Sequence, residues 1–230
     1  VNANIGTLAV DGALTQSGTI NVASGATFSR TAGFTNTGTL SGDGTIVVGM
    51  GISGLVNQGN IDPAGNGVTG TLAITGDVQL ATGSSLNIEL GGTAAGQYDT
   101  LSVSGALTGN AGSFGSLTLT RVNGYTATNG DGFQLISAAS GIDTATFAPF
   151  SLHRVSLTPS YVATSFTLGA DPMVLTVTAD ALNKVYGSAD PPRTYTVTGF
   201  DTGDTAIDVL SGNVGRAAGE NVGLYAITQN

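Results

Sequence analysis

The chain has 230 residues but no cysteine, no tryptophan and a single histidine, His153. Without cysteine it forms no disulfide, so a secreted protein of this sequence depends on packing and hydrogen bonds for its stability. One histidine without cysteine excludes the multi-histidine and thiolate sites that hold zinc, and no Gly-x-Ser-x-Gly motif carries a plausible base. We therefore expect no metal and no cofactor, and we interpret His153 as a residue of a strand surface.

Basic residues are also scarce. The six Lys and Arg residues are scattered among 15 Asp and Glu, and the net charge is −9. Nucleic-acid binding and recruitment to anionic lipid both need clustered positive charge, so both partner classes are excluded. No run of apolar residues approaches 18, which excludes a helix that spans a membrane.

Glycine, in contrast, is abundant, with 36 residues, and several of them mark a repeat. Residues 16–21 (QSGTIN) return as 36–41 (NTGTLS) and as 57–62 (NQGNID), so the glycines lie 20 and then 21 residues apart. Self-similarity at a fixed period of this size is typical of repeat architectures.

Short alternating runs fill residues 1–90 between the glycines. In 85–90 (SLNIEL) the alternation predicts that the aliphatic side chains face inward and that Asn87 and Glu89 face outward. Glycine at the corners supplies positive φ at no steric cost. Because no helical crossovers separate the runs, the pattern predicts an all-β, right-handed parallel β-helix with strands about 4.8 Å apart and about eight turns of roughly 20 residues.

The 20-residue rhythm stops near Gly169. Residues 1–169 hold 11 charged residues, whereas the last 61 hold 10. We therefore predict a β-helical stalk over 1–169, a linker at 170–172 and a small β domain over 173–230.

Three segments of the stalk, 59–78, 98–105 (YDTLSVSG) and 130–138 (GDGFQLISA), resemble a signature of β-helical passenger regions. These regions belong to autotransporters and to filamentous-haemagglutinin-like adhesins of two-partner secretion systems. The resemblance covers about residues 55–170.

The C-terminal segment is similar to the MBG repeat, a small β-grasp-like module found in tandem in large bacterial adhesins. The similarity lies in 184–187 (KVYG), Asp190-Pro191 and 219–227 (GENVGLYAI). The usual module continues for another strand or two, which implies that 173–230 form a partial module with one sheet edge unpaired. Core packing in the module accounts for Tyr186, Tyr195 and Tyr225.

The resemblances imply an adhesin of the Gram-negative cell surface or a secreted one, exported through a transporter pore in the outer membrane. They also imply a role in adhesion or biofilm cohesion, with extracellular polysaccharide or a host or neighbouring cell surface as partner. We expect a structural module and not an enzyme.

Two alternatives remain open. The first is a β-helical polysaccharide lyase or hydrolase, which needs two carboxylates on one face; stacking could bring together Asp43 with Asp62, or Asp77 with Asp99. The favoured interpretation is that these residues are solvated turn residues. The second is a specific lectin, for which the loop aromatic Tyr125 is a weak candidate binding residue.

Overall fold

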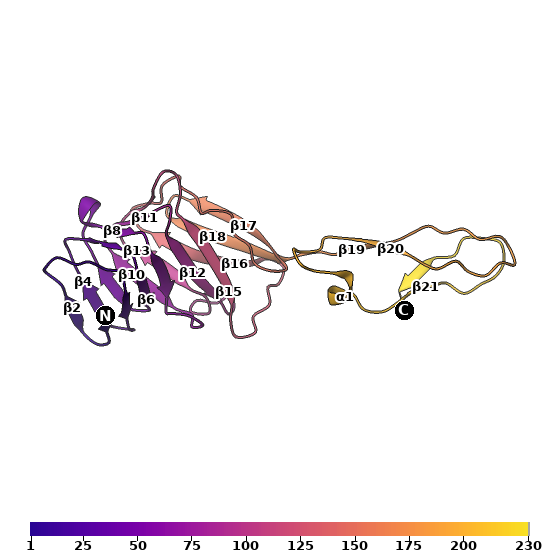
Figure 1. The fold of residues 1–230 in the computed structure, drawn as a ribbon, viewed down its shortest axis with the longest axis horizontal. Coiled ribbons are helices and arrows are strands. Elements are labelled where there is room, and N and C mark those ends of the chain that lie inside the picture. The colour runs from indigo at the N-terminus through magenta and orange to yellow at the C-terminus, as the bar shows by residue number, and fades with distance from the viewer. Residues whose placement is uncertain (230) are drawn as a thin grey trace. The chain divides into compact units, whose positions relative to one another are not determined.

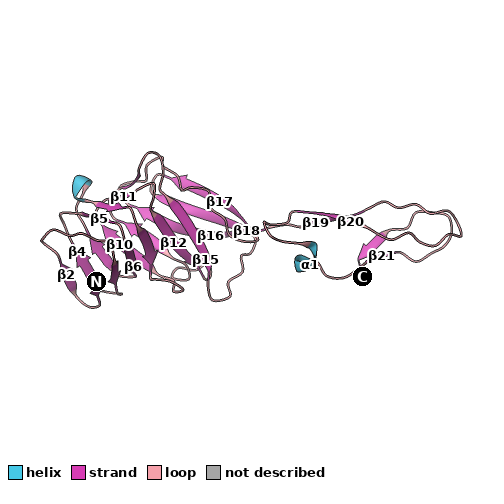
Figure 2. Cartoon of the chain, in the orientation of Figure 1, coloured by secondary structure: helices cyan, strands magenta, loops and turns pink. Residues whose placement is uncertain are grey.

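The computed structural model describes residues 1–229, so Asn230, the last residue of the predicted C-terminal domain, lies outside the described part. The chain divides into two compact units, Val1–Asp171 and the segment from Pro172 onward. Strands and loops make up almost all of both (Figures 1 and 2). The described helical segments are a 3-10 turn at Gly51–Ser53 and the one-turn helix α1 at Ala206–Val209.

Three sheets build the first unit. The six-stranded sheet contains β1 (Asn2–Ala3), β3 (Thr19–Val22), β6 (Thr39–Gly42), β9 (Asn60–Pro63), β12 (Ser85–Leu90) and β15 (Ser116–Arg121). The eight-stranded sheet contains β2 (Thr7–Ala9), β4 (Thr27–Ser29), β7 (Thr45–Val47), β10 (Thr71–Thr75), β13 (Thr100–Val103), β16 (Asp131–Ala138), β18 (Ser165–Pro172) and β17 (Val155–Val162). The four-stranded sheet contains β5 (Phe34–Asn36), β8 (Leu55–Asn57), β11 (Val78–Leu80) and β14 (Leu107–Gly109).

Successive strands pass from sheet to sheet, so that β6, β7 and β8 belong to three different sheets and β9 returns to the first beside β6. All pairs among the strands from β1 to β16 are parallel, as in β4 with β7 and β5 with β8. The expected solenoid class is thereby confirmed. The predicted eight turns of about 20 residues are not found, because the later coils contain more residues than the first ones. Along the six-stranded sheet, Thr19 pairs with Thr39, Thr39 with Asn60, Asn60 with Ser85 and Ser85 with Ser116.

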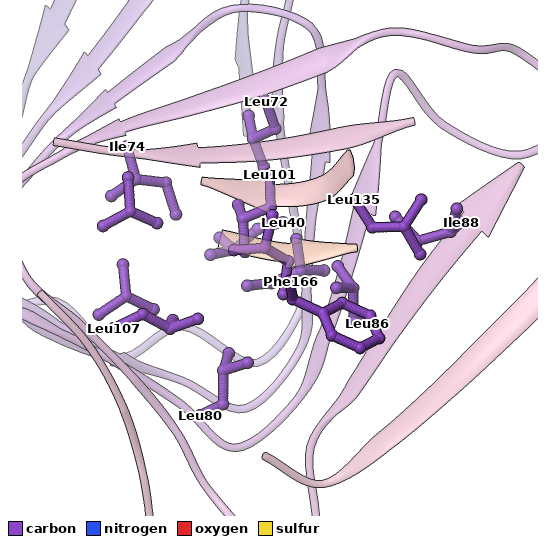
Figure 3. Packing of buried hydrophobic residues seen from close by; sticks show 14 of the residues in the cluster. Leu40, Leu72, Ile74, Leu80, Leu86, Ile88, Leu101, Leu107, Leu135 and Phe166 are labelled. Carbon is purple, nitrogen blue, oxygen red and sulfur yellow. The ribbon is translucent and has the colours of Figure 1, made fainter. Parts of the chain in front are cut away.

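Aliphatic side chains fill the interior in files that run from strand to strand. One file consists of Ile20, Leu40, Ile61, Leu86 and Leu117, each at most 5% exposed. Figure 3 shows neighbouring members of such files in contact, among them Leu72 and Leu101. Each added coil thus removes a further layer of apolar surface from water, which is the main stabilising contribution in a solenoid.

The repeat glycines have a different role from the one predicted. Gly18, Gly38 and Gly59 do not adopt positive φ. Instead, a Cβ on Gly38 would lie 1.9 Å from the carbonyl oxygen of Gly18, and a Cβ on Gly59 would lie 2.1 Å from that of Gly38. The expectation of a left-handed corner is therefore wrong at these three positions, and at Gly38 and Gly59 it is the close approach of one coil to the next that requires glycine.

The first residue of each repeat forms a buried polar ladder. Gln16, Asn36 and Asn57 are at most 5% exposed, and the Asn36 Nδ2 donates to Asn57 Oδ1 over 2.6 Å. Each side chain also donates to a nearby backbone carbonyl, such as Asn57 Nδ2 to Gly59 O at 3.1 Å. These bonds satisfy buried amides that would otherwise cost free energy. On the next coil Leu80 pairs with Asn57, and the ladder gives way to aliphatic packing.

The parallel stack ends before residue 169. A turn separates β17 from β18, and β18 pairs with β16 in the antiparallel sense. Aromatic rings close this end of the core: Phe166 lies 4.7 Å from Tyr161 and 5.3 Å from Phe147, measured between ring centroids. The reversal therefore ends the parallel sequence of rungs and covers the last apolar layer.

The second unit contains two antiparallel pairs, β19 (Thr176–Ala179) with β20 (Tyr195–Thr198) and β21 (Val214–Arg216) with β22 (Ile227–Gln229). Among its described residues no apolar side chain is buried, and the chain's apolar core ends at Ala170. Tyr186 is 73% exposed and Tyr195 41% exposed, so the expectation that they pack in a core is wrong.

Candidate functional site

The outer face of the eight-stranded sheet carries small hydroxyl side chains in register. We call this row the hydroxyl file. It consists of Thr7, Thr27, Thr45, Ala73, Ser102, Ser137 and Ser165, each paired with the next across the sheet. Only Ala73 lacks a hydroxyl. From Thr27 to Ser137 the residues on either side of each member are buried in the core, so the file itself faces away from the core, as strand alternation requires.

A shallow groove of about 450 Å³ crosses this face over β10, β13 and β16. Its outward side chains are uncharged and, apart from Gln134, small. They belong to Ala73, Thr75, Ser102, Ser104, Gln134, Ser137, Ala139 and Thr164. Adjacent hydroxyls are close, with Ser102 Oγ and Ser137 Oγ 3.4 Å apart. The groove thus offers several hydroxyl donors and acceptors and no charge.

Tyr125 lies elsewhere, in the loop between β15 and β16, and does not line this groove. Its hydroxyl donates to Asp131, whose carboxylate also accepts from the Thr128 amide at 2.7 Å. Its ring packs edge-on against Phe133, with 6.0 Å between centroids. Burial and the bond to Asp131 raise the pKa of Tyr125 far above its usual range. The side chain therefore holds its own loop in place, with its polar end already engaged.

Buried carboxyl groups form a separate cluster that the alternation pattern did not reveal. Glu89 is only 3% exposed and Asp99 is fully buried, so the expectation that Glu89 faces solvent is wrong. A hairpin-like excursion between Leu90 and Tyr98 returns the chain over β12, and the loop after β9 lies over the same side. These two segments cover a side chain that points away from the core.

Hydrogen bonds tie the cluster to both covering segments. Asp99 accepts from the amides of Glu89 and Gly70, each at 2.8 Å, and Glu89 Oε1 accepts from the Gly67 amide at 3.3 Å. Burial, together with the side-chain hydrogen bond to Glu89, raises the pKa of Asp99 to about 9. Burial and the charge of Glu89 also raise the pKa of Asp62. The raised pKa favours the protonated form of Asp99 at neutral pH, beside the Glu89 carboxyl group.

The carboxylate pairs considered for catalysis are not formed. Across β6 and β9 it is Ser41, and not Asp43, that pairs with Asp62. Asp77 accepts from the amides of Gly51 and Ala106, at 2.6 and 2.7 Å, and so fixes turns. The pair that does form, Glu89 with Asp99, is sealed from solvent and has no room for a substrate beside it. Within residues 1–229, no group of three or more acidic or histidine side chains could hold a metal ion.

The second unit is organised around Asp190. Its carboxylate accepts from Lys184 Nζ and Arg193 Nη2 at 2.6 Å and from Arg216 Nε at 2.7 Å. The bonds from Arg216 and Lys184 hold the pKa of Asp190 far below its usual range. The Arg216 guanidinium also lies over the Tyr225 ring, 5.1 Å from its centroid. This network borders a pocket of about 280 Å³.

The fold is thus a parallel β-solenoid with a small antiparallel β unit that contains a network of ion pairs. Residues 175–230 match the family model of the MBG domain (YGX type), which supports the MBG-like module expected from the sequence. In a comparison with curated proteins, none matches the chain significantly. No helix among the described residues is long and apolar enough to cross a membrane.

Proposed function

We propose that this chain is a module of an extracellular bacterial adhesin, in which the β-solenoid serves as a stalk beside an MBG unit. The match of residues 175–230 to the MBG domain is the observation that carries the proposal. The filamentous-haemagglutinin-like or autotransporter type, with export through a transporter pore to the Gram-negative surface, is the finer form of the same proposal. It has the sequence resemblance of residues 55–170 in its favour.

Physical properties of the solenoid support such a role. Stacked coils form an extended body from short repeats, and the stack is stabilised without disulfides. An unfolded chain without cysteine passes a pore without the risk of premature cross-links. The broad polar faces suit weak contacts, which gain strength when many copies are displayed together. We propose extracellular polysaccharide, or the surface of a neighbouring or host cell, as the partner.

Surface display tests this proposal. The chain is anchored on a non-adherent Gram-negative strain, and autoaggregation and biofilm mass are measured. We expect both to rise relative to cells that display an unrelated domain. Cells that display Ile20→Asp, in which a charge replaces a side chain 1% exposed, are the control for folding and should lose the gain. Folded, displayed protein that leaves aggregation and biofilm unchanged would refute the adhesive role.

We propose no catalytic role for the carboxyl groups of the solenoid, because the one close pair is inaccessible. Incubation with acidic and neutral polysaccharides, followed by assay of new reducing ends and of unsaturated products, tests this directly. Turnover that disappears in Asp99→Asn or Asp77→Asn would reverse the ranking in favour of a carbohydrate-active enzyme.

A further inference from the structure

The groove over β10, β13 and β16 has properties that specify a ligand. Its floor is low because the outward side chains there are Ala73, Ser102 and Ser137, while Gln134 and Thr164 contribute larger exposed side chains. A groove that is open and shallow suits a long ligand that lies along it, more than a small molecule that must be enclosed to bind well.

Charge narrows the class of ligand. No Lys, Arg, Asp or Glu lines the groove, although the whole chain carries a net charge of −9. A phosphorylated or uronate polymer would find no cation there to pair with and would be repelled by the overall field. An uncharged ligand does not need charged side chains in the groove in order to bind. Its polar groups must instead be matched by hydroxyls and amides, which the groove supplies.

The regular spacing of the hydroxyl file limits the class of ligand further. The hydroxyl file repeats at the strand spacing, about 4.8 Å, so a ligand that crosses from β13 to β16 meets a serine hydroxyl at two successive steps, Ser102 and Ser137, with Ala73 beside them on β10. Hydroxyl groups both donate and accept, so they match the hydroxyls of a sugar in either orientation. Repeated weak contacts along one chain add up because each contact raises the effective concentration for the next.

We propose that this groove binds an extended, uncharged polysaccharide that lies across β10, β13 and β16 with its hydroxyls along Ser102 and Ser137. The inference rests on the proposed adhesive function and names the chemistry of its partner. An anionic polysaccharide is the competing outcome of the test.

Binding is measured with the whole chain on immobilised dextran, xyloglucan and galactomannan, with alginate as the anionic counterpart. Ser102→Arg places a long charged side chain in the middle of the groove. Its matched control is Thr118→Arg on the exposed outer face of β15, in the six-stranded sheet. We expect the native chain to bind at least one uncharged polymer and not alginate, and Ser102→Arg to weaken that binding by about tenfold or more while Thr118→Arg leaves it unchanged. Circular dichroism and melting curves establish that both variants fold.

Three results would overturn the inference: binding to none of the uncharged polymers, binding to alginate alone, or equal binding by native protein and folded Ser102→Arg. Should Ser102→Arg fail to fold, Gln134→Ala at the exposed edge provides the same comparison. The display assay separates this failure from that of the proposed function. If displayed protein promotes aggregation and the Ser102→Arg form does so equally well, the groove is wrong and the adhesive function stands.

Discussion

The buried pair Glu89 and Asp99 leads to a specific prediction about pH. In the folded chain the pKa of Asp99 is about 9, whereas the ordinary value is 3.8. Between these values the folded state keeps a proton that the unfolded state releases. The free energy of unfolding therefore falls as pH rises through this window and levels off above about pH 9. One proton corresponds to about 1.4 kcal/mol per pH unit, so from pH 5 to pH 8 the loss is on the order of 4 kcal/mol.

Glu89→Gln should weaken this dependence, because it removes the contribution of Glu89 and retains that of burial. The Glu89 Oε2 atom is buried and accepts no conventional donor among the described residues, so the proton held by Asp99 fills that place. In the variant the amide oxygen can still accept from the Gly67 amide, and the amide nitrogen can donate to Asp99. Asp99 can then ionise while keeping its bonds from the Glu89 and Gly70 amides, because the backbone is unchanged.

Urea unfolding followed by far-ultraviolet circular dichroism at about pH 5, 6, 7 and 8 provides the measurement. We expect the native chain to lose stability across the series and Glu89→Gln to give a shallower slope, because the contribution of Glu89 is gone while burial still raises the pKa of Asp99 and of Asp62. Asp131, Asp190 and Glu220 have lowered pKa values, so their contributions change only below this range. The exposed Asp11 provides a control, and Asp11→Asn should keep the native slope.

A native chain whose stability is constant from pH 5 to pH 8 would refute the raised pKa of Asp99. If the free energy of unfolding falls with pH equally steeply in native protein and in Glu89→Gln, a group other than this pair is responsible for the pH dependence. A variant that is less stable than native protein at every pH would show that the amide does not fit between the two covering loops.

Further predictions concern the stack and the second unit. Ile20→Asp should lower the free energy of unfolding by about 3 kcal/mol or more, and an unchanged melting curve would contradict the stacking register. Gly38→Ala should destabilise the solenoid by about 2 kcal/mol or more, because the new Cβ meets the Gly18 carbonyl. The control Gly18→Ala, which has open space around it, should cost less than about 1 kcal/mol. Similar melting temperatures for the two variants would contradict the close approach of the coils at Gly38. Asp190→Asn should speed limited proteolysis of the segment after Pro172 and leave the solenoid intact, and an unchanged cleavage rate would show that the ion pairs do not hold this unit together.

Much of the fold could be predicted from the sequence because a solenoid is built from local repeats. The spacing of the 16–21, 36–41 and 57–62 segments and the alternation between them determine the strands, their inward side chains and their parallel stacking. The longer coils and the antiparallel strand β18 could not be predicted in this way, because neither is part of a repeat in the sequence.

The groove and the carboxyl pair depend on contacts between distant residues. Ser102 and Ser137 lie in different coils whose spacing no longer follows the early period, so their register comes only from the folded sheet. The alternation of the strand correctly predicts that Glu89 points away from the aliphatic core, but it does not predict the loops that cover the Glu89 side chain.

The sequence by itself determined a parallel solenoid of apolar files, because strand alternation and a fixed repeat length act within a few residues. It also determined a C-terminal unit of different composition. Only the tertiary structure decided why Gly38 must be glycine, which carboxyl groups lie together in the interior and where a neutral groove opens on the surface. Each of these depends on which coil lies against which, and that is set by packing across the whole stack.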